Sequence, residues 1–161
     1  MTAYPTADTD LSIAIDDLRG PEIHALLARH LETMRALSPP ESVHALDIER
    51  LRRPEISFWT VRDGGLLVGC GALKRMQADE GEITSMHTAA EHRGKGVAET
   101  MLMHILRAAE ADGIKRLYLE TGSQPGFEPA RRLYAKHGFA FCEPFGDYRP
   151  DPNSVFMTRL L

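Results

Sequence analysis

Hydrophobic and polar positions alternate in some segments of the chain and follow helical spacing in others. The alternation at 11–15 predicts a strand that is buried on one face. Apolar residues then recur every three or four positions, which predicts a helix that begins at Pro21 and ends before Ser38-Pro39-Pro40. A second, shorter helix is expected over 42–51, with Ser42 as its N-terminal cap.

The middle of the chain predicts a β-hairpin followed by a third strand. Strands over 56–61 and 66–73 flank Asp63-Gly64-Gly65, which is a strong turn signal. The third strand, over 82–89, leads into the glycine-rich segment 93–96.

The last third of the chain alternates helices and strands. The strongest helical pattern covers 97–109 and ends near Gly113. Leu117-Tyr118-Leu119 is typical of a strand that is buried on both faces, as a central parallel strand would be. The remaining elements are a helix from Pro129 to Gly138 and strands over 139–142 and 155–161. The order β-α-α-β-β-β-α-β-α-β-β predicts an α/β fold in which helices pack on a central mixed sheet.

Length and composition favour a single globular domain. The 161 residues suit one domain over 11–161, with residues 1–10 as a flexible N-terminus. A net charge of -4 and the absence of a basic cluster argue against nucleic-acid and membrane partners, and no apolar run reaches the roughly 20 residues of a membrane span. Cys70 and Cys142 are expected to be reduced core thiols of a cytoplasmic protein. The histidines lack metal-ligand spacing, so no metal site is expected.

The segment from Arg93 to Ala98 carries the clearest chemical signal. Its two glycines let the backbone approach a ligand, free N–H groups at the start of a helix favour an anion, and Arg93 and Lys95 add positive charge. The expected ligand is a phosphate or a diphosphate. The spacing fits neither a Walker loop nor a dinucleotide fingerprint. On spacing alone, the loop could also be a turn that only begins the following helix.

Two segments resemble signatures of the GNAT superfamily of N-acetyltransferases. Arg93, Gly96 and Ala98 match the acyl-coenzyme A loop of that family, Arg/Gln-x-x-Gly-x-Gly/Ala, and 130–139 resembles its second signature, in which Leu-Tyr precedes Gly-Phe. The order of elements is similar over nearly the whole chain. Two departures are Ala90, where the family often has Pro, and Phe127 or Glu128, where it often has Asn. The resemblance implies a mixed, mostly antiparallel twisted sheet of about six to seven strands with helices on both faces.

The resemblance also implies a reaction, in which an acetyl group passes from acetyl-CoA directly to a primary amine of a small molecule or a protein. Glu82 is the expected base acting through water, with Glu120, His87 and water alone as alternatives, and Tyr134 is the expected acid for the departing thiolate. A backbone N–H of 86–88 would stabilise the oxyanion. The residues expected to bind the cosubstrate are Met86, His87, Thr88, Arg93, Gly94, Lys95, Gly96, Val97 and Ala98.

Regular strand alternation places Glu82, Thr84, Met86 and Thr88 on one face and His87 on the other, which weakens His87 as the base unless a bulge intervenes.

Other functions stay open at this point. The same fold could serve as a non-catalytic module that binds or senses acyl-CoA, and the loop could belong to a nucleotide-phosphate enzyme. The polar segment 76–80 could attract a cationic acceptor, and the loop over 145–152 either shapes the acceptor pocket or simply connects two strands. A homodimer through an exposed sheet edge is a further expectation.

Overall fold

The computed structural model describes residues 10–40 and 48–161. The expected flexible segment 1–10 therefore lies, except for its last residue, outside the described part, and so do residues 42–47 of the expected second helix, with its cap Ser42. The last four residues of that helix, Ile48–Leu51, are helical as expected and form α2.

The order of the elements confirms the predicted order. In chain order they are β1 (Leu11–Ile15), α1 (Pro21–Leu37), α2 (Ile48–Leu51), β2 (Ile56–Asp63), β3 (Leu66–Arg75), β4 (Glu80–Thr88), α3 (Val97–Ala111), β5 (Arg116–Gly122), α4 (Glu128–Lys136), β6 (Ala140–Cys142) and β7 (Ser154–Leu160). Short 3₁₀ turns at Ala90–His92 and Pro125–Phe127 precede α3 and α4.

The strands form one seven-stranded sheet in the order β1-β2-β3-β4-β5-β7-β6. All neighbours are antiparallel except β4 and β5, which run parallel. The prediction for 117–119 is therefore correct on one side of β5 only, because β7 on the other side is antiparallel. Leu117 and Leu119 are buried as predicted, but Tyr118 between them is only half-buried.

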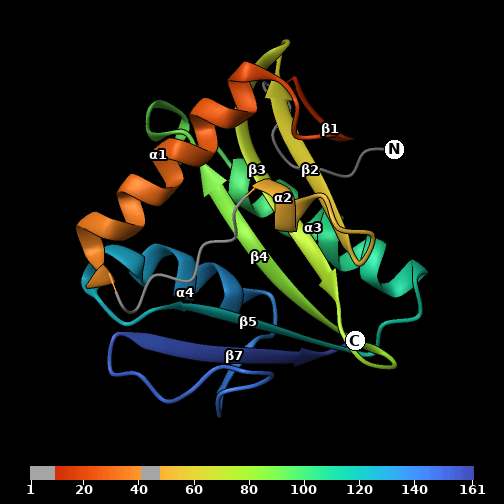
Figure 1. Cartoon of the computed structure of the whole chain (residues 1–161), viewed down its shortest axis with the longest axis vertical. Coiled ribbons are helices and arrows are strands. Elements are labelled where there is room, and N and C mark those ends of the chain that lie inside the picture. Colours follow the sequence, from red (N-terminus) through yellow and green to blue (C-terminus); the bar gives the residue numbers. More distant parts are fainter. Residues whose placement is uncertain (1–9, 41–47) are drawn as a thin grey trace.

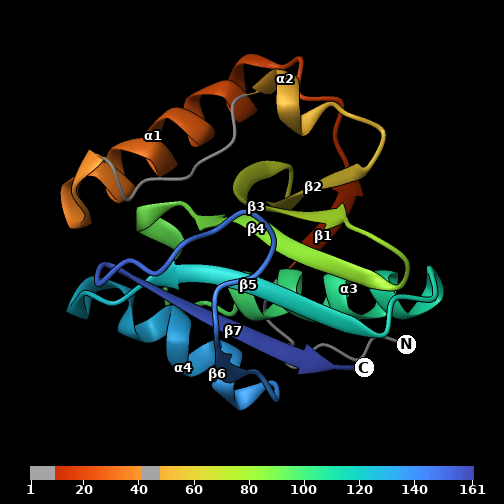
Figure 2. The same ribbon diagram turned by 60° about the horizontal axis from the view of Figure 1, so that its bottom comes forward.

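Helices cover both faces of this sheet (Figures 1 and 2). α1 and α2 lie on one face, where Ile23, Leu26 and Leu51 pack against Phe58 and Ala72. α3 and α4 lie on the other face, over a larger apolar core. Apolar residues at helical spacing on α1 and α3 are thus buried against opposite faces of a shared sheet, which explains why both helices form.

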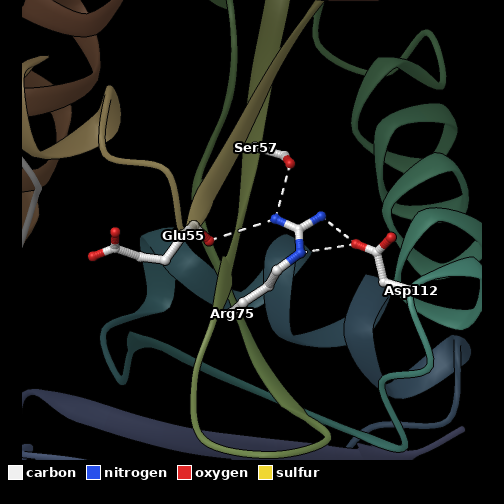
Figure 3. A network of polar contacts seen from close by, with 4 residues as sticks. All are labelled: Glu55, Ser57, Arg75 and Asp112. Atoms are coloured by element: carbon white, nitrogen blue, oxygen red, sulfur yellow. Dashed lines mark hydrogen bonds and ion pairs between the residues drawn. The ribbon is translucent and has the colours of Figure 1, made fainter.

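Helix α3 packs very closely on β3. A Cβ atom at Gly71 would lie 2.7 Å from Met101 Cγ and 2.8 Å from Met86 Sδ, so only glycine fits there without displacement of side chains. The C-terminal end of α3 is attached to the same hairpin by Arg75, as Figure 3 shows. Its guanidinium donates to Ser57 Oγ at 3.0 Å and, through Nε, to Asp112 Oδ2 at 2.9 Å. These contacts fix α3 relative to β3, and with it the loop that precedes α3.

A bulge in β4 changes which side chains face the site. Cys70 pairs with His87 and Ala72 pairs with Thr84, so between these two pairs β4 has one residue more than β3. Ser85, in this stretch of β4, adopts a φ of 57°. As a result His87 contacts α1, on the face that Glu82 and Thr84 share, while Met86 packs toward α3. The expectation that Met86 lies with Glu82 and that His87 lies opposite was wrong, because the extra residue reverses the alternation.

β4 and β5 separate beyond their first four pairs. Their pairing runs from Glu80↔Arg116 to Ile83↔Leu119, yet β4 continues to Thr88 and β5 to Gly122. Figure 1 shows the two strands diverging. The backbone of β4 after Ile83 therefore has no strand partner on this side, and the sheet opens where α4 and α1 approach it.

The two cysteines differ in their surroundings. Cys70 is buried as expected, donates to the carbonyl oxygen of Ser85 at 3.2 Å, and has its thiol pKa raised to about 12, mainly by burial. Cys142 is half-buried and lines a cleft, so its assignment to the core was wrong. Both thiols are free within the described structure. Among the helices that could be searched, none is long and apolar enough to cross a membrane.

Candidate active site

Two cavities meet at the centre of β4. The larger is a cleft of about 1550 Å³ over β3, β4, β5 and the connection between β6 and β7. The smaller, of about 120 Å³, lies where β4 and β5 separate, between the C-terminal half of α1 and the start of α4. Glu82, Thr84 and Tyr148 line both. These three side chains therefore lie between a group bound in one cavity and a group bound in the other.

Glu82 is buried at this junction, with 7% of its surface exposed. Its Oε2 atom accepts a hydrogen bond of 2.7 Å from the Tyr148 hydroxyl. Burial, followed by the negative charge of Glu82, raises the pKa of Tyr148 well above its usual value, so the phenol stays protonated and donates. A buried carboxylate needs such a donor, because burial without hydrogen bonds is costly.

Tyr148 belongs to the loop over 145–152, which lines the larger cleft as well as connecting β6 to β7. Figure 2 shows the connection passing in front of β5. Aromatic contacts hold it in place: the Phe145 ring stacks on Tyr118 at 4.8 Å and meets Tyr148 edge-on at 5.0 Å. Tyr148 was not predictable as a site residue, because it lies in no recognisable motif.

Tyr134 lies on the wall of the smaller cavity. It is 6% exposed and makes an edge-on contact with Phe139, while burial raises the pKa of its phenol. No other described residue takes a hydrogen bond from its hydroxyl. α4 is oriented by Arg131, whose Nη1 donates to the carbonyl oxygens of Gly122 at 2.7 Å and Gln124 at 3.0 Å. The structure thus brings Glu82 and Tyr134 to one cavity from two distant segments.

The alternative bases are placed less favourably. Glu120 lines only the smaller cavity, where its Oε2 accepts from Ser154 Oγ at 2.6 Å. His87 is not among the residues lining either cavity. Its Nδ1 lies 3.1 Å from Nδ1 of His30, and burial, the neighbouring His30 and two arginines lower its pKa to about 3. Such an imidazole is neutral at pH 7, but it lies away from both cavities.

The residues expected to bind the cosubstrate lie in two places, the end of β4 (86–88) and the start of α3 (93–98). Met86 lines the smaller cavity, whereas His87 and Thr88 do not appear among its lining residues. Where the family often has Asn, Phe127 lines this cavity, and its ring lies so close to Gly122 that a Cβ there would be 2.0 Å from it. An amide comes instead from Asn153, a second site residue that the sequence analysis missed, whose Oδ1 accepts from Gln124 Nε2 at 2.9 Å.

The glycine-rich loop presents free amides at the start of α3. Gly94 and Gly96 have φ values of 78° and 82°, a conformation that favours glycine, and Gly96 is the N-cap residue with no side-chain cap. The first amide of this turn with a described acceptor is that of Thr100, bonded to the Gly96 carbonyl oxygen at 2.9 Å. The earlier N–H groups are thus available to an anion, and Arg93 and Lys95 are exposed beside them.

The side chains of this turn are otherwise occupied. Val97 is buried, so it and Ala98 offer their backbone rather than a polar group. Glu99 accepts from Lys136 Nζ at 2.8 Å and from His137 Nε2 at 2.7 Å, which lowers its pKa and ties the start of α3 to the end of α4. This pairing keeps the Glu99 carboxylate partly neutralised beside an expected anion site.

Two further expectations concern the polar segment 76–80 and a metal site. Of the segment 76–80, Glu80 lines the larger cleft and accepts from the Tyr118 hydroxyl at 3.4 Å, but Asp79 is exposed and is not part of the lining. In the part of the chain that could be searched, no three His, Cys, Asp or Glu side chains are grouped as a metal site would need.

Residues 23–139 match the model of the Acetyltransferase (GNAT) family. The chain belongs to this family. The uncharacterized N-acetyltransferase YsnE of Bacillus subtilis (strain 168) is 55% identical over 94% of this chain and 100% of its own length. Membership makes the chain an acyltransferase of the acetyl-CoA-dependent N-acetyltransferase type, which removes the alternative of a nucleotide-phosphate enzyme.

Solved structures of acyltransferases share the fold. A protein from Klebsiella pneumoniae subsp. pneumoniae MGH 78578, described as a candidate acyl-CoA N-acyltransferase, superposes with a TM-score of 0.76 at 26% identity, covering 94% of this chain and 98% of that one. The PaiA N-acetyltransferase of Thermoplasma acidophilum, solved in complex with coenzyme A, gives a TM-score of 0.70 at 18% identity over 94% and 99% of the two chains. The mixed, mostly antiparallel sheet expected from the resemblance is therefore confirmed.

Proposed function

We propose that this chain transfers an acetyl group from acetyl-CoA directly to an amine held in the larger cleft, with Glu82 as the base. The observation that carries the proposal is the position of Glu82 between two cavities that meet. The smaller cavity suits the narrow end of a thioester carrier, and the larger one has room for an acceptor. Two bound reactants held at such a junction react as if they were one molecule.

The residues at the start of α3 fit the diphosphate of coenzyme A. The backbone N–H groups from Gly94 to Ala98 would donate hydrogen bonds to its oxygens, and a Cβ at Gly94 would meet nothing within 4 Å, so the loop is open to a ligand. Arg93 and Lys95 would add charge. When bound, acetyl-CoA supplies an acyl group activated as a thioester, and Met86 and Phe127 would contact the part that enters the smaller cavity.

Glu82 would remove the proton that keeps the acceptor unreactive. An alkyl ammonium has a pKa near 10 and has no free electron pair until it loses a proton. Glu82 would take that proton, directly or through one water, while Tyr148 holds its carboxylate in place. The amine nitrogen then forms a bond to the carbonyl carbon, and the bond from that carbon to sulfur breaks.

Tyr134 would give a proton to the departing sulfur. Because its pKa is raised, its hydroxyl remains protonated throughout the neutral range, and that hydroxyl has no competing acceptor among the described residues. The negative charge on the carbonyl oxygen would be stabilised by a backbone N–H of β4 beyond Ile83, where the strand has no partner on the β5 side. The nitrogen then loses its remaining extra proton, and Tyr134 regains one through solvent, so the products are an N-acetylated amine and free coenzyme A.

The experiment that tests this proposal measures thiol release from acetyl-CoA over a panel of amines and peptides, with the acetylated product identified by mass spectrometry. Glu82→Gln should lower kcat by about 10²- to 10⁴-fold, the range expected for loss of a general base. Glu120→Gln is the matched control, because it lines one cavity only, and it should change kcat by less than about tenfold. Equal losses in the two variants, or the larger loss in Glu120→Gln, would reject Glu82 as the base.

A further inference from the structure

Three side chains of different chemistry stand in one row across the floor of the larger cleft. Lys74 on β3 is the register partner of Glu82 on β4, and Glu82 is the register partner of Tyr118 on β5. All three line the cleft. Register partners point to the same face with Cβ atoms about 5 Å apart. A cation, a carboxylate and an aromatic ring are therefore within reach of one small ligand.

The cation of this row is not used within the described structure. Lys74 is half-buried, and no described carboxylate oxygen lies within 4.0 Å of its ammonium group, although Glu82 is its direct neighbour. A second cation, Arg116, lies on the same face of β5 two residues before Tyr118 and donates to Thr158 Oγ1 at 3.2 Å. Two half-buried cations on the floor would bind an anionic group of the acceptor.

Glu82 and Glu80 are the register partners of Lys74 and Arg116 on the neighbouring strand, but each of these carboxylates also accepts a hydrogen bond from a tyrosine. Glu80 accepts a hydrogen bond from the Tyr118 hydroxyl, and Glu82 accepts one from the Tyr148 hydroxyl. Glu143 and Asp147 are exposed on the loop at the rim. The positive charge of Lys74 thus lies on the floor, one strand away from the base, and the acidic side chains of the loop lie at the entrance.

Tyr118, the third residue of the row, is part of an aromatic wall of the cleft that also contains Phe145 and Tyr148. Tyr118 stacks on Phe145 with an angle of 25° between the rings, and Tyr148 completes the wall beside Glu82. These rings continue from the base away from Lys74. An apolar or aromatic substituent that packs along them would gain burial without the loss of any polar contact.

From this row we infer that the acceptor is a free α-amino acid with an aromatic or large apolar side chain, an inference that depends on the proposed function. Its amine would lie beside Glu82, its carboxylate beside Lys74 and Arg116, and its side chain along Tyr118 and Tyr148. The short spacing between neighbouring strands matches a ligand whose amine and carboxylate are carried by the same carbon. A peptide or a simple amine lacks a carboxylate on the carbon that carries the reacting amine.

The test compares L-phenylalanine with L-phenylalanine amide and with phenethylamine as acceptors, measured as kcat/KM by thiol release. The wild type should prefer L-phenylalanine over both by at least about tenfold. In Lys74→Met the ratio of kcat/KM for L-phenylalanine to that for phenethylamine should fall about 10- to 100-fold, as expected for loss of a hydrogen bond between charged groups. Lys115→Met is the matched control, because Lys115 is exposed and outside the cleft lining, and it should leave the ratio unchanged.

The outcomes separate this inference from the proposed function. If all three acceptors react equally well, or if Lys74→Met leaves the ratio unchanged, the amino-acid assignment is overturned while acetyl transfer stands. Acetylation of peptides but not of free amino acids would likewise overturn it, in favour of a protein acceptor. If no amine or peptide in either panel releases thiol, the proposed function fails and the inference fails with it.

Discussion

The histidine pair between α1 and β4 should make the stability of the fold depend on pH. His30 and His87 contact each other through their Nδ1 atoms at 3.1 Å, so one ring donates and the other accepts, which requires the accepting ring to be neutral. Burial lowers the pKa of His30 from 6.5 to about 4 and, with the charges of His30, Arg93 and Arg29, that of His87 to about 3.

The sign follows from proton binding by the two states. Between pH 6.5 and about 4 the unfolded chain binds more protons at these two positions than the native state does, so the free energy of unfolding falls as the pH falls. From pH 7 to pH 5 the loss amounts to about 2 kcal/mol for each imidazole, or about 4 kcal/mol for the pair. His30→Leu removes one of the two imidazoles. Between pH 7 and pH 5 the free energy of unfolding of this variant should therefore fall by about 2 kcal/mol less than that of the wild type.

Urea denaturation at pH 7 and pH 5 measures this difference, because the titration of all other groups is shared by the two proteins. His24→Gln is the matched control on the same helix, since His24 is exposed and the amide can still donate to the Leu18 carbonyl oxygen. It should show the pH dependence of the wild type. If His30→Leu loses as much stability as the wild type between pH 7 and pH 5, the account of this pair is refuted.

Three further predictions concern the acid, the loop and the attachment of α3. Tyr134→Phe should lower kcat by about 100-fold or more in the thiol-release assay while the Tm stays unchanged, and an unchanged kcat would remove Tyr134 as the acid. Gly96→Ala forces a side chain into the left-handed region, so urea denaturation should show a loss of about 1–2 kcal/mol and the KM for acetyl-CoA should rise. Arg75→Met should lose about 1 kcal/mol of stability by urea denaturation, and the double variant with Asp112→Asn should lose less than the sum of the two singles, whereas strict additivity would show that their contact contributes nothing.

Periodicity and turn chemistry were sufficient to predict the order of the elements. Helices α1 and α3 have wide apolar faces, and the β2–β3 hairpin has a turn that needs glycine at positive φ, as Gly64 and Gly65 show. These signals are local, so they can be interpreted without knowing which elements pack against each other. The loop before α3 was predictable for the same reason. Its glycines and the free amides at the start of the helix come from consecutive residues, so they can be recognised in the sequence alone.

The errors arose where distant segments meet. The bulge at Ser85 lies in Thr84-Ser85-Met86, where no glycine announces it, and it reversed the predicted faces of Met86 and His87. Tyr148 reaches Glu82 from a loop 66 residues later in the chain, a contact that sheet order and loop packing decide. Local propensity carries no information about either feature.

The central claim is that the α3 loop and the β4 junction act on one bound carrier, and a crystal structure with coenzyme A tests it most directly. We expect the diphosphate oxygens to accept hydrogen bonds from backbone N–H groups between Gly94 and Ala98, and the thiol to end in the smaller cavity with Tyr134 within hydrogen-bond distance. A diphosphate bound away from this loop, or a thiol outside the cavity that Glu82 and Tyr134 share, would contradict the account.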